Sequence, residues 1–312
     1  AGLLTDVFVN YSVCNCLNFM VGQYDLAFSM ENQTSDNTTS FMERSIGVGF
    51  AAPYKKEIGL TIWGELLDAR LAYAFEVLVG DGQNRPQVDS FADFSGRVFT
   101  RPLFGSKSPI EKLQVGMSAR TGKRDPKFVG YDYVPVATTQ GYALWAPTYK
   151  DSLGRTVHVI PSGSQSAIGG EFRLPVSMFE LRGEAYYVAN DTREAVDGYQ
   201  LTNTERLGQM AGVGWYAQAS AWPLGDRFIN GDPGFLRPTN VDLNKEIGRP
   251  RRGLEVLALV GGVHADYQGN SRGGAADAKT ATLETGSKID VLQYAFGLNY
   301  WYTRNLRVAV NY

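Results

Sequence analysis

The stretch YAFGLNYWYTRNLRVAVNY, residues 294–312, poses the question that decides the fold class. Apolar residues alternate with polar or small residues in both of its halves, 294–300 and 306–312, and the polar residues 303–305 separate them. Two alternating strands joined by a tight polar turn predict a β-hairpin. In a soluble sandwich the apolar face packs inward, whereas in an outer-membrane barrel it meets lipid and the other face lines a lumen. The rest of the chain must choose between the two.

Composition limits the classes of protein. The chain has 312 residues, of which 44% are hydrophobic and 20% charged, with a net charge of −2. Disorder and a nucleic-acid partner are therefore not expected. No apolar run approaches the roughly 18–20 residues of a membrane-spanning helix, and no secretory signal is present, so the chain is expected to be mature or already cut. No metal-binding or phosphate-binding loop motif occurs, and no cofactor is expected.

The two cysteines, Cys14 and Cys16, are too few and too close for a zinc site. A disulfide across one residue is expected to be strained, so no role is assigned to them.

Alternating segments recur along the whole chain. Most have the roughly 9–11 residues that a tilted membrane strand needs. No helical segment of useful length and no linker is found, so residues 1–312 are predicted to form a single all-β domain. The twelve expected strands are 6–13, 17–25, 57–66, 71–80, 91–101, 113–122, 165–174, 178–188, 210–222, 254–266, 290–302 and 306–312.

The connections between these strands are alternately short and long, apart from an exceptional long one at 223–252. An outer-membrane barrel has this pattern, with short periplasmic turns and long outer loops. The sequence therefore predicts a transmembrane antiparallel β-barrel of about twelve strands. A soluble all-β fold remains the alternative.

Strand parity assigns residues to the two faces of the barrel. The residues expected to face lipid include Tyr11, Val115, Leu181, Trp215, Leu298 and Val310. The lumen is expected to hold Arg97, Arg101, Arg120, Arg173, Arg182 and Arg307, with at least as many carboxylates. We interpret most of these arginines as members of ion pairs that brace the wall.

The directions of the strands bear on the size of the barrel. If short turns are periplasmic, an odd number of strands must precede residue 1 and follow residue 312. Bacterial barrels have even strand totals, so fourteen or sixteen strands are expected in the whole protein. Alternatively, Tyr312 is the true end of a terminal strand.

Five stretches carry a resemblance to a known family: VFVNY (7–11), VGQYDLAF (21–28), TTSFMERSIGVGFAAP (38–53), QASAWPLGDRF (218–228) and FGLNYWYTRNLRVAVNY (296–312). In order and spacing they resemble the phosphate-selective porins of the O/P type. The resemblance covers both ends of the chain and is poor over 103–165.

The resemblance implies a sixteen-strand barrel, usually trimeric, in which N-terminal strands and the last strand lie outside this chain. It also implies that 29–56 folds into the lumen with 41–45 as the constriction, and that 223–252 is a large periplasmic connection. Three positions depart from the family: Gln23 and Asp25 stand where it has lysines, and Leu259 where it has an arginine. Phosphate selectivity is therefore not expected.

Independently of the resemblance, the loop before residue 57 is too apolar to stand in water. Its residues Phe41, Met42, Ile46, Val48 and Phe50 are expected to pack on the inner wall. Glu43 and Arg44, which the resemblance places at the constriction, would then meet charges of the wall. Arg44 and Arg120 are expected to be the arginines most able to act without a carboxylate partner.

The expected function is passive diffusion of small solutes through the bacterial outer membrane, with a weak preference for anions. The expected partners are outer-membrane lipid, small anions or other small solutes, and two further copies in a homotrimer. The alternative is a structural or docking barrel of an envelope-spanning complex with a blocked lumen, suggested by the apolar Leu257, Leu259 and Val263 near the lumen face. An enzyme is a weaker alternative: His158 and His264 could be combined with Ser118 or Ser220, but no spacing demands it.

Overall fold

The structure is a computed structural model. It describes residues 6–36, 38–52, 55–79, 90–124, 135–138, 141–147, 149–150, 154, 156–196, 207–225, 252–269, 288–303 and 306–312.

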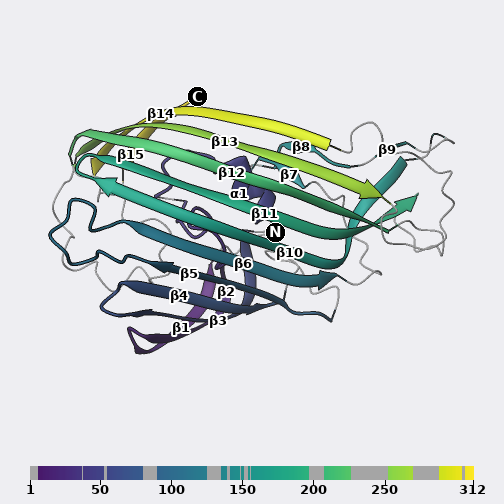
Figure 1. The fold of residues 1–312 in the computed structure, drawn as a ribbon, viewed down its shortest axis with the longest axis horizontal. Coiled ribbons are helices and arrows are strands. Elements are labelled where there is room, and N and C mark those ends of the chain that lie inside the picture. Colours follow the sequence, from purple (N-terminus) through teal and green to yellow (C-terminus); the bar gives the residue numbers. More distant parts are fainter. Residues whose placement is uncertain are drawn as a thin grey trace.

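Every one of the twelve expected strands is present. They form one antiparallel path in which each strand pairs with the strand before and after it (Figure 1). They are β1 (Val7–Cys14), β2 (Leu17–Asp25), β3 (Lys56–Leu66), β4 (Leu71–Leu78), β5 (Asp93–Thr100), β6 (Gln114–Arg124), β10 (Thr156–Val176), β11 (Phe179–Val196), β12 (Leu207–Leu224), β13 (Gly253–Gly269), β14 (Lys288–Thr303) and β15 (Leu306–Asn311). This consecutive antiparallel order is that of an up-and-down barrel wall.

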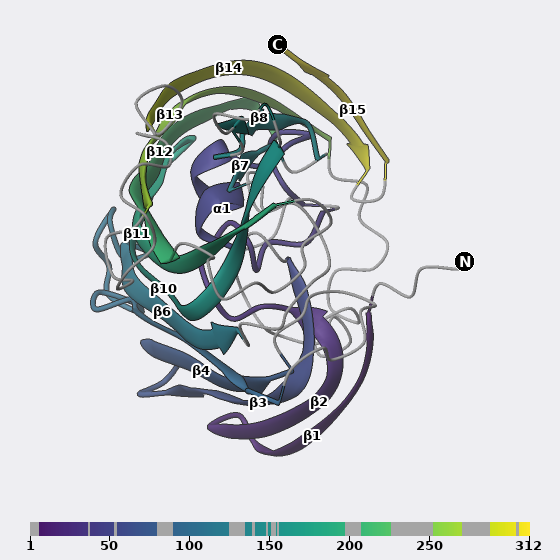
Figure 2. The same ribbon diagram turned by 90° about the vertical axis from the view of Figure 1, so that its right-hand side faces the viewer.

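The sheet curls around an interior that contains the short helix α1 (Ile46–Ala51) (Figure 2). β1 and β15 are the two ends of the strand path, and no pairing joins them within the described residues. The described sheet is therefore a strongly curved wall whose two edge strands remain open.

The two faces of the wall differ as parity predicts. Tyr11, Val115, Leu181, Leu298 and Val310 are exposed on the convex face. Trp215, the sixth residue expected to face lipid, is half-buried because its indole lies against Gly262. Arg97, Arg101, Arg173 and Arg182 are buried on the concave face, and Arg120 and Arg307 are partly buried there. No helix in the described ranges is long and apolar enough to cross a membrane.

Three features differ from the sequence prediction. Strands β10 to β14 are 16 to 21 residues long, because they extend beyond the segments in which the faces alternate clearly. Inside the expected connection 123–163 lie three short strands, β7 (Val136–Ala137), β8 (Ala143–Trp145) and β9 (Tyr149–Lys150). The helix α1 was not expected.

The expectation for the two cysteines is also corrected. Cys14 and Cys16 form a disulfide at the turn between β1 and β2, with their Cα atoms 5.1 Å apart. The turn is tied to the next hairpin as well, since Glu65 N donates to Asn15 O and Tyr73 Oη donates to Cys16 O. The expected long connection 223–252 lies outside the described residues except at its two ends.

Candidate functional site

The candidate site is the interior of the curved sheet, which is filled by the segment between β2 and β3. Its described residues are 26–36, 38–52 and 55; residues 26–36 and 38–52 lie against the concave face, and we call them the inward segment (Figure 2). Phe41, Ile46, Val48 and Phe50 are buried, as expected from their apolar character, whereas Met42 is 67% exposed, contrary to expectation.

Helix α1 packs its apolar side chains on an apolar strip of the wall. Ser45 caps the helix by accepting a hydrogen bond from Val48 N at 3.3 Å. Ile46, Val48 and Phe50 belong to a buried cluster that also contains wall residues from β10 to β13. The wall members of that cluster include Val159, Ala167, Tyr186, Val188, Met210, Tyr216, Leu257, Leu259 and Val263.

Two glycines permit this close packing of helix on sheet. A Cβ at Gly47 would lie 2.7 Å from Trp215 N, and a Cβ at Gly214 would lie 2.9 Å from Gly47 O. Any other residue at either position would push α1 away from β12.

A second segment adds to the apolar filling. Val136 of β7 and Trp145 of β8 are buried in the same cluster as α1. A Cβ at Gly49 of the helix would lie 2.9 Å from Ala137 O, so the short hairpin also approaches α1 closely.

Polar side chains of the wall attach the middle of the inward segment. Arg182 Nη2 donates to Ser40 Oγ at 3.0 Å, and Asn299 Nδ2 donates to Ser40 O at 2.7 Å. Arg307 Nη1 donates to Thr39 O. A fourth attachment involves β15, where Asn311 Oδ1 accepts from Met42 N at 3.0 Å.

Arg44 folds back on the inward segment itself. Its guanidinium donates to Glu31 O and Thr34 O and pairs with Asp36 at 2.8 Å. The expectation that Arg44 lacks a carboxylate partner is therefore wrong. Burial opposes the ionisation of Asp36, but the hydrogen bond from Lys55 and the charge of Arg44 outweigh it and lower the pKa of Asp36. Glu43, the other residue expected at the constriction, is partly buried.

Several wall arginines make ion pairs with carboxylates on nearby strands. Arg97 binds both oxygens of Glu171, each at 2.7 Å, and Arg173 Nη2 lies 2.8 Å from Glu180. The sequence had not selected Arg124, which binds both oxygens of Asp93. These pairs join strands of the wall, and they include two of the six arginines that parity assigned to the lumen.

The other two arginines have different surroundings. Arg101 stacks over the Phe104 ring, with its guanidinium carbon 4.8 Å from the ring centre. Arg120 Nε donates to Ala51 O, at the end of α1, at 2.8 Å.

Asp25, which stands where the family has a lysine, lies next to the start of the inward segment and is itself paired with a lysine. Lys56 lies opposite Asp25 in the β2–β3 register, and its Nζ contacts Asp25 at 2.7 Å and Asp6 at 2.6 Å. The cation on β3 is thus matched by carboxylates. Gln23, the neighbouring departure, is buried.

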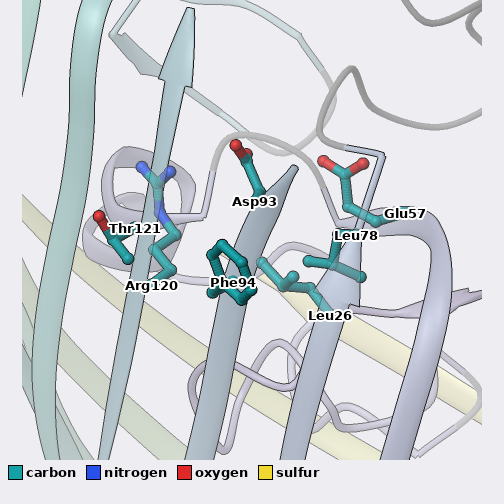
Figure 3. A pocket seen from close by; sticks show the side chains of 7 residues that line it. All are labelled: Leu26, Glu57, Leu78, Asp93, Phe94, Arg120 and Thr121. Carbon is teal, nitrogen blue, oxygen red and sulfur yellow. The ribbon is translucent and has the colours of Figure 1, made fainter. Parts of the chain in front are cut away.

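A small hollow lies between the inward segment and β3 to β6. Figure 3 shows the carboxylates of Glu57 and Asp93 and the guanidinium of Arg120 at one end of it, with Leu26, Leu78 and Phe94 toward the other. It therefore presents charges of both signs.

Two of the residues considered for catalysis, Ser118 and His264, lie on different faces of the wall. Ser118 is buried on the concave face, where its Oγ accepts from Ser29 N at 3.2 Å. His264 is exposed, and it pairs with Asp290 on the neighbouring strand.

Sequence reasoning missed the main role of two wall glutamates. Strand parity places Glu76 and Glu184 among the lumen carboxylates, but both bind backbone N–H groups of the inward segment. Glu76 accepts from Ala27 N at 2.7 Å, and Glu184 accepts from Met30 N at 2.7 Å and Glu31 N at 2.9 Å. A backbone partner leaves no signal in a sequence beyond the lumen parity of the glutamate.

The comparisons agree with this architecture. A family model described as phosphate-selective porin O and P matches residues 1–227, which include the inward segment and the strands from β1 to β12. The resembling stretch 296–312 lies outside the matched residues. No curated protein shows significant similarity to the chain.

Proposed function

Because this chain belongs to the phosphate-selective porin O and P family of bacterial outer-membrane porins, we propose that it is a passive diffusion channel for small solutes and ions with at most a weak preference for anions. The inward segment is its constriction, residues 223–252 form a large periplasmic connection, and outer-membrane lipid covers the convex face. The family is one of channels and not of enzymes, so His158 and His264 receive no catalytic role. The proposed assembly is a homotrimer, for which the family resemblance is the support.

The pairing of cations in the interior carries the proposal on selectivity. A site that strips water from an anion needs several cations or N–H donors that are not already compensated. Here five cations each contact a carboxylate at 2.7 to 2.8 Å: Arg44, Lys56, Arg97, Arg124 and Arg173. Paired charges leave little net potential beyond a Debye length of about 8 Å.

Reversal potentials across planar bilayers in a KCl gradient test this proposal. We expect a weak anion preference and no block of chloride current by micromolar phosphate. Replacing Arg120 with glutamine removes a cation that donates to a backbone carbonyl, so the preference should move toward cations. Strong phosphate block of the wild-type channel would refute the proposed selectivity.

A second candidate function is a structural or docking barrel with a blocked lumen. It is favoured by the apolar packing of α1 against Leu257, Leu259 and Val263, which fills part of the interior with hydrophobic side chains. Single-channel recording separates the two candidates, because a blocked barrel conducts no ions.

A further inference from the structure

Residues 29–31 form a turn that points two consecutive backbone N–H groups at one carboxylate. Met30 N donates to Glu184 Oε1 at 2.7 Å, and Glu31 N donates to Glu184 Oε2 at 2.9 Å. Ser29 has φ of 70°, in the left-handed region that non-glycine residues rarely adopt. Successive N–H groups beside a left-handed residue make a concave nest that binds anions. The turn is therefore an anion nest, and Glu184 occupies it.

Wall side chains form hydrogen bonds both with the nest and with the Glu184 carboxylate that occupies it. Tyr216 Oη donates to Glu184 Oε2 at 2.7 Å, and Ser29 Oγ donates to the same oxygen at 3.2 Å. Ser29 N donates to Ser118 Oγ, and Tyr186 Oη lies 3.1 Å from Ser29 Oγ. Side chains from β6, β11 and β12 thus clasp one turn of the inward segment.

This attachment differs in kind from the others. Among the described residues, Glu184 is the wall carboxylate that accepts two consecutive N–H groups of the inward segment, whereas Glu76 accepts one. Residues 39–40 accept three hydrogen bonds from wall donors through neutral oxygens, and Ser40 Oγ donates one to the wall carboxylate of Glu255 at 3.3 Å, so the wall carboxylate there binds a hydroxyl group and not a backbone N–H group. Hydrogen bonds to an ionised acceptor are shorter and roughly twice as strong as neutral ones. The bond of Glu184 to the nest should therefore dominate the position of the segment's first half.

We propose that Glu184 is a positioning residue of the constriction, acting as a tethered anion in the nest of residues 29–31. By filling the nest it fixes the depth of the inward segment and keeps small solute anions from binding there. The inference deepens the proposed function and rests on it where conductance is the measurement. The ligand class for the emptied nest is a small carboxylate.

Chemical rescue tests the inference directly. The variant Glu184→Ala removes the atoms beyond Cβ, which correspond closely to acetate. In planar bilayers this variant should show raised and more variable conductance, and acetate should return it toward the wild-type value. Chloride at the same ionic strength is the control for salt.

Glu180→Ala is the matched variant, because Glu180 lies on the same strand and face but pairs with Arg173 of the wall. Its conductance should not respond to acetate. The inference is overturned if acetate leaves Glu184→Ala unchanged, or if it acts equally on both variants.

A second readout does not depend on conduction. Ser35 is an exposed residue of the inward segment, so a cysteine placed there reports the segment's position through its rate of thiol labelling. Labelling should be faster in Glu184→Ala than in the wild-type background and slow again with acetate. If the protein conducts no ions but this labelling pattern is observed, the proposed channel function is refuted and the inference about Glu184 is supported.

Glu184→Gln keeps the side chain's size and covers the case in which the alanine variant does not fold. Its amide group cannot accept from both N–H groups through two oxygens, and it leaves no room for acetate. Faster labelling that acetate does not reverse is expected, and wild-type labelling would refute the inference.

Discussion

Replacing Arg97 with methionine should destabilise the fold by about 3–5 kcal/mol, because it leaves a buried carboxylate without its countercharge. The Arg97 and Glu171 side chains are each 1% exposed, and two contacts of 2.7 Å join them. Arg97 Nη1 also donates to Gln33 Oε1 of the inward segment at 2.7 Å. After the substitution, Glu171 would retain the hydrogen bond from Gln114 Nε2 at 2.9 Å, which cannot replace a full positive charge.

The double variant Arg97→Met/Glu171→Leu separates loss of the charge pair from loss of packing. Replacing a whole buried ion pair with apolar residues is often neutral or stabilising. The double variant should therefore be more stable than Arg97→Met alone, with a coupling of about 0.5–3 kcal/mol between the sites. Reversible urea unfolding of the protein in detergent measures all the variants needed.

The same pair makes a prediction for conduction. In Arg97→Met the unpaired Glu171 should shift the reversal potential toward cation preference, and the double variant should return it to the wild-type value. The pairing would be refuted if the losses of stability from the two single substitutions simply add in the double variant and the reversal potential of Arg97→Met is unchanged.

Three further predictions concern other parts of the structure. Deleting residues 36–44 should raise single-channel conductance, because these residues fill the interior; an unchanged value would contradict their role as the constriction. Gly214→Ala should displace α1, whose Gly47 oxygen would lie 2.9 Å from the new Cβ, and should lower the unfolding midpoint in urea. Reducing the Cys14–Cys16 disulfide should lower the free energy of unfolding by about 2 kcal/mol or less, because so short a loop restricts the unfolded chain little. Unfolding measured with and without dithiothreitol tests this, and a larger difference would contradict it.

The sequence predicted the strands well because each face of the wall meets a different environment. Period-two alternation is strong where one side of a strand is apolar and the other polar. It fails at the start of β10, where residues 159–162 are buried in succession. The predicted strand began at 165, after this interruption, whereas the structure begins the strand at Thr156.

The helix could not be predicted for a different reason. The segment IGVGFA contains two glycines, which destabilise a helix interior, and six residues are too few to form a stable helix alone. Its stability comes from packing against β11 to β13, and Gly47 is needed there for close approach. The glycines that let the segment pack closely on the wall are also the residues whose low helix propensity argues against a helix.

Parity placed the charged residues on the correct face but did not identify their partners. Arg97 and Glu171 are 74 residues apart, and they meet across β6 only because of the register of β5, β6 and β10. Arg44 finds Asp36 through the folding of the inward segment, on which strand parity has no bearing. A count of charges predicted that the net charge of the interior is close to zero. Which cation pairs with which carboxylate depends on the tertiary structure.

Glu184 illustrates the limit of such counting most clearly. A carboxylate that accepts from a backbone places no demand on the side chains of Met30 and Glu31, so their identities reveal nothing about the attachment. The demand falls instead on Ser29, which must adopt a left-handed conformation and also donate its hydroxyl to Glu184. Glycine at position 29 would ease the backbone conformation but lose the hydroxyl contacts with Glu184 and Tyr186. Serine therefore reconciles the shape of the nest with its connection to the wall.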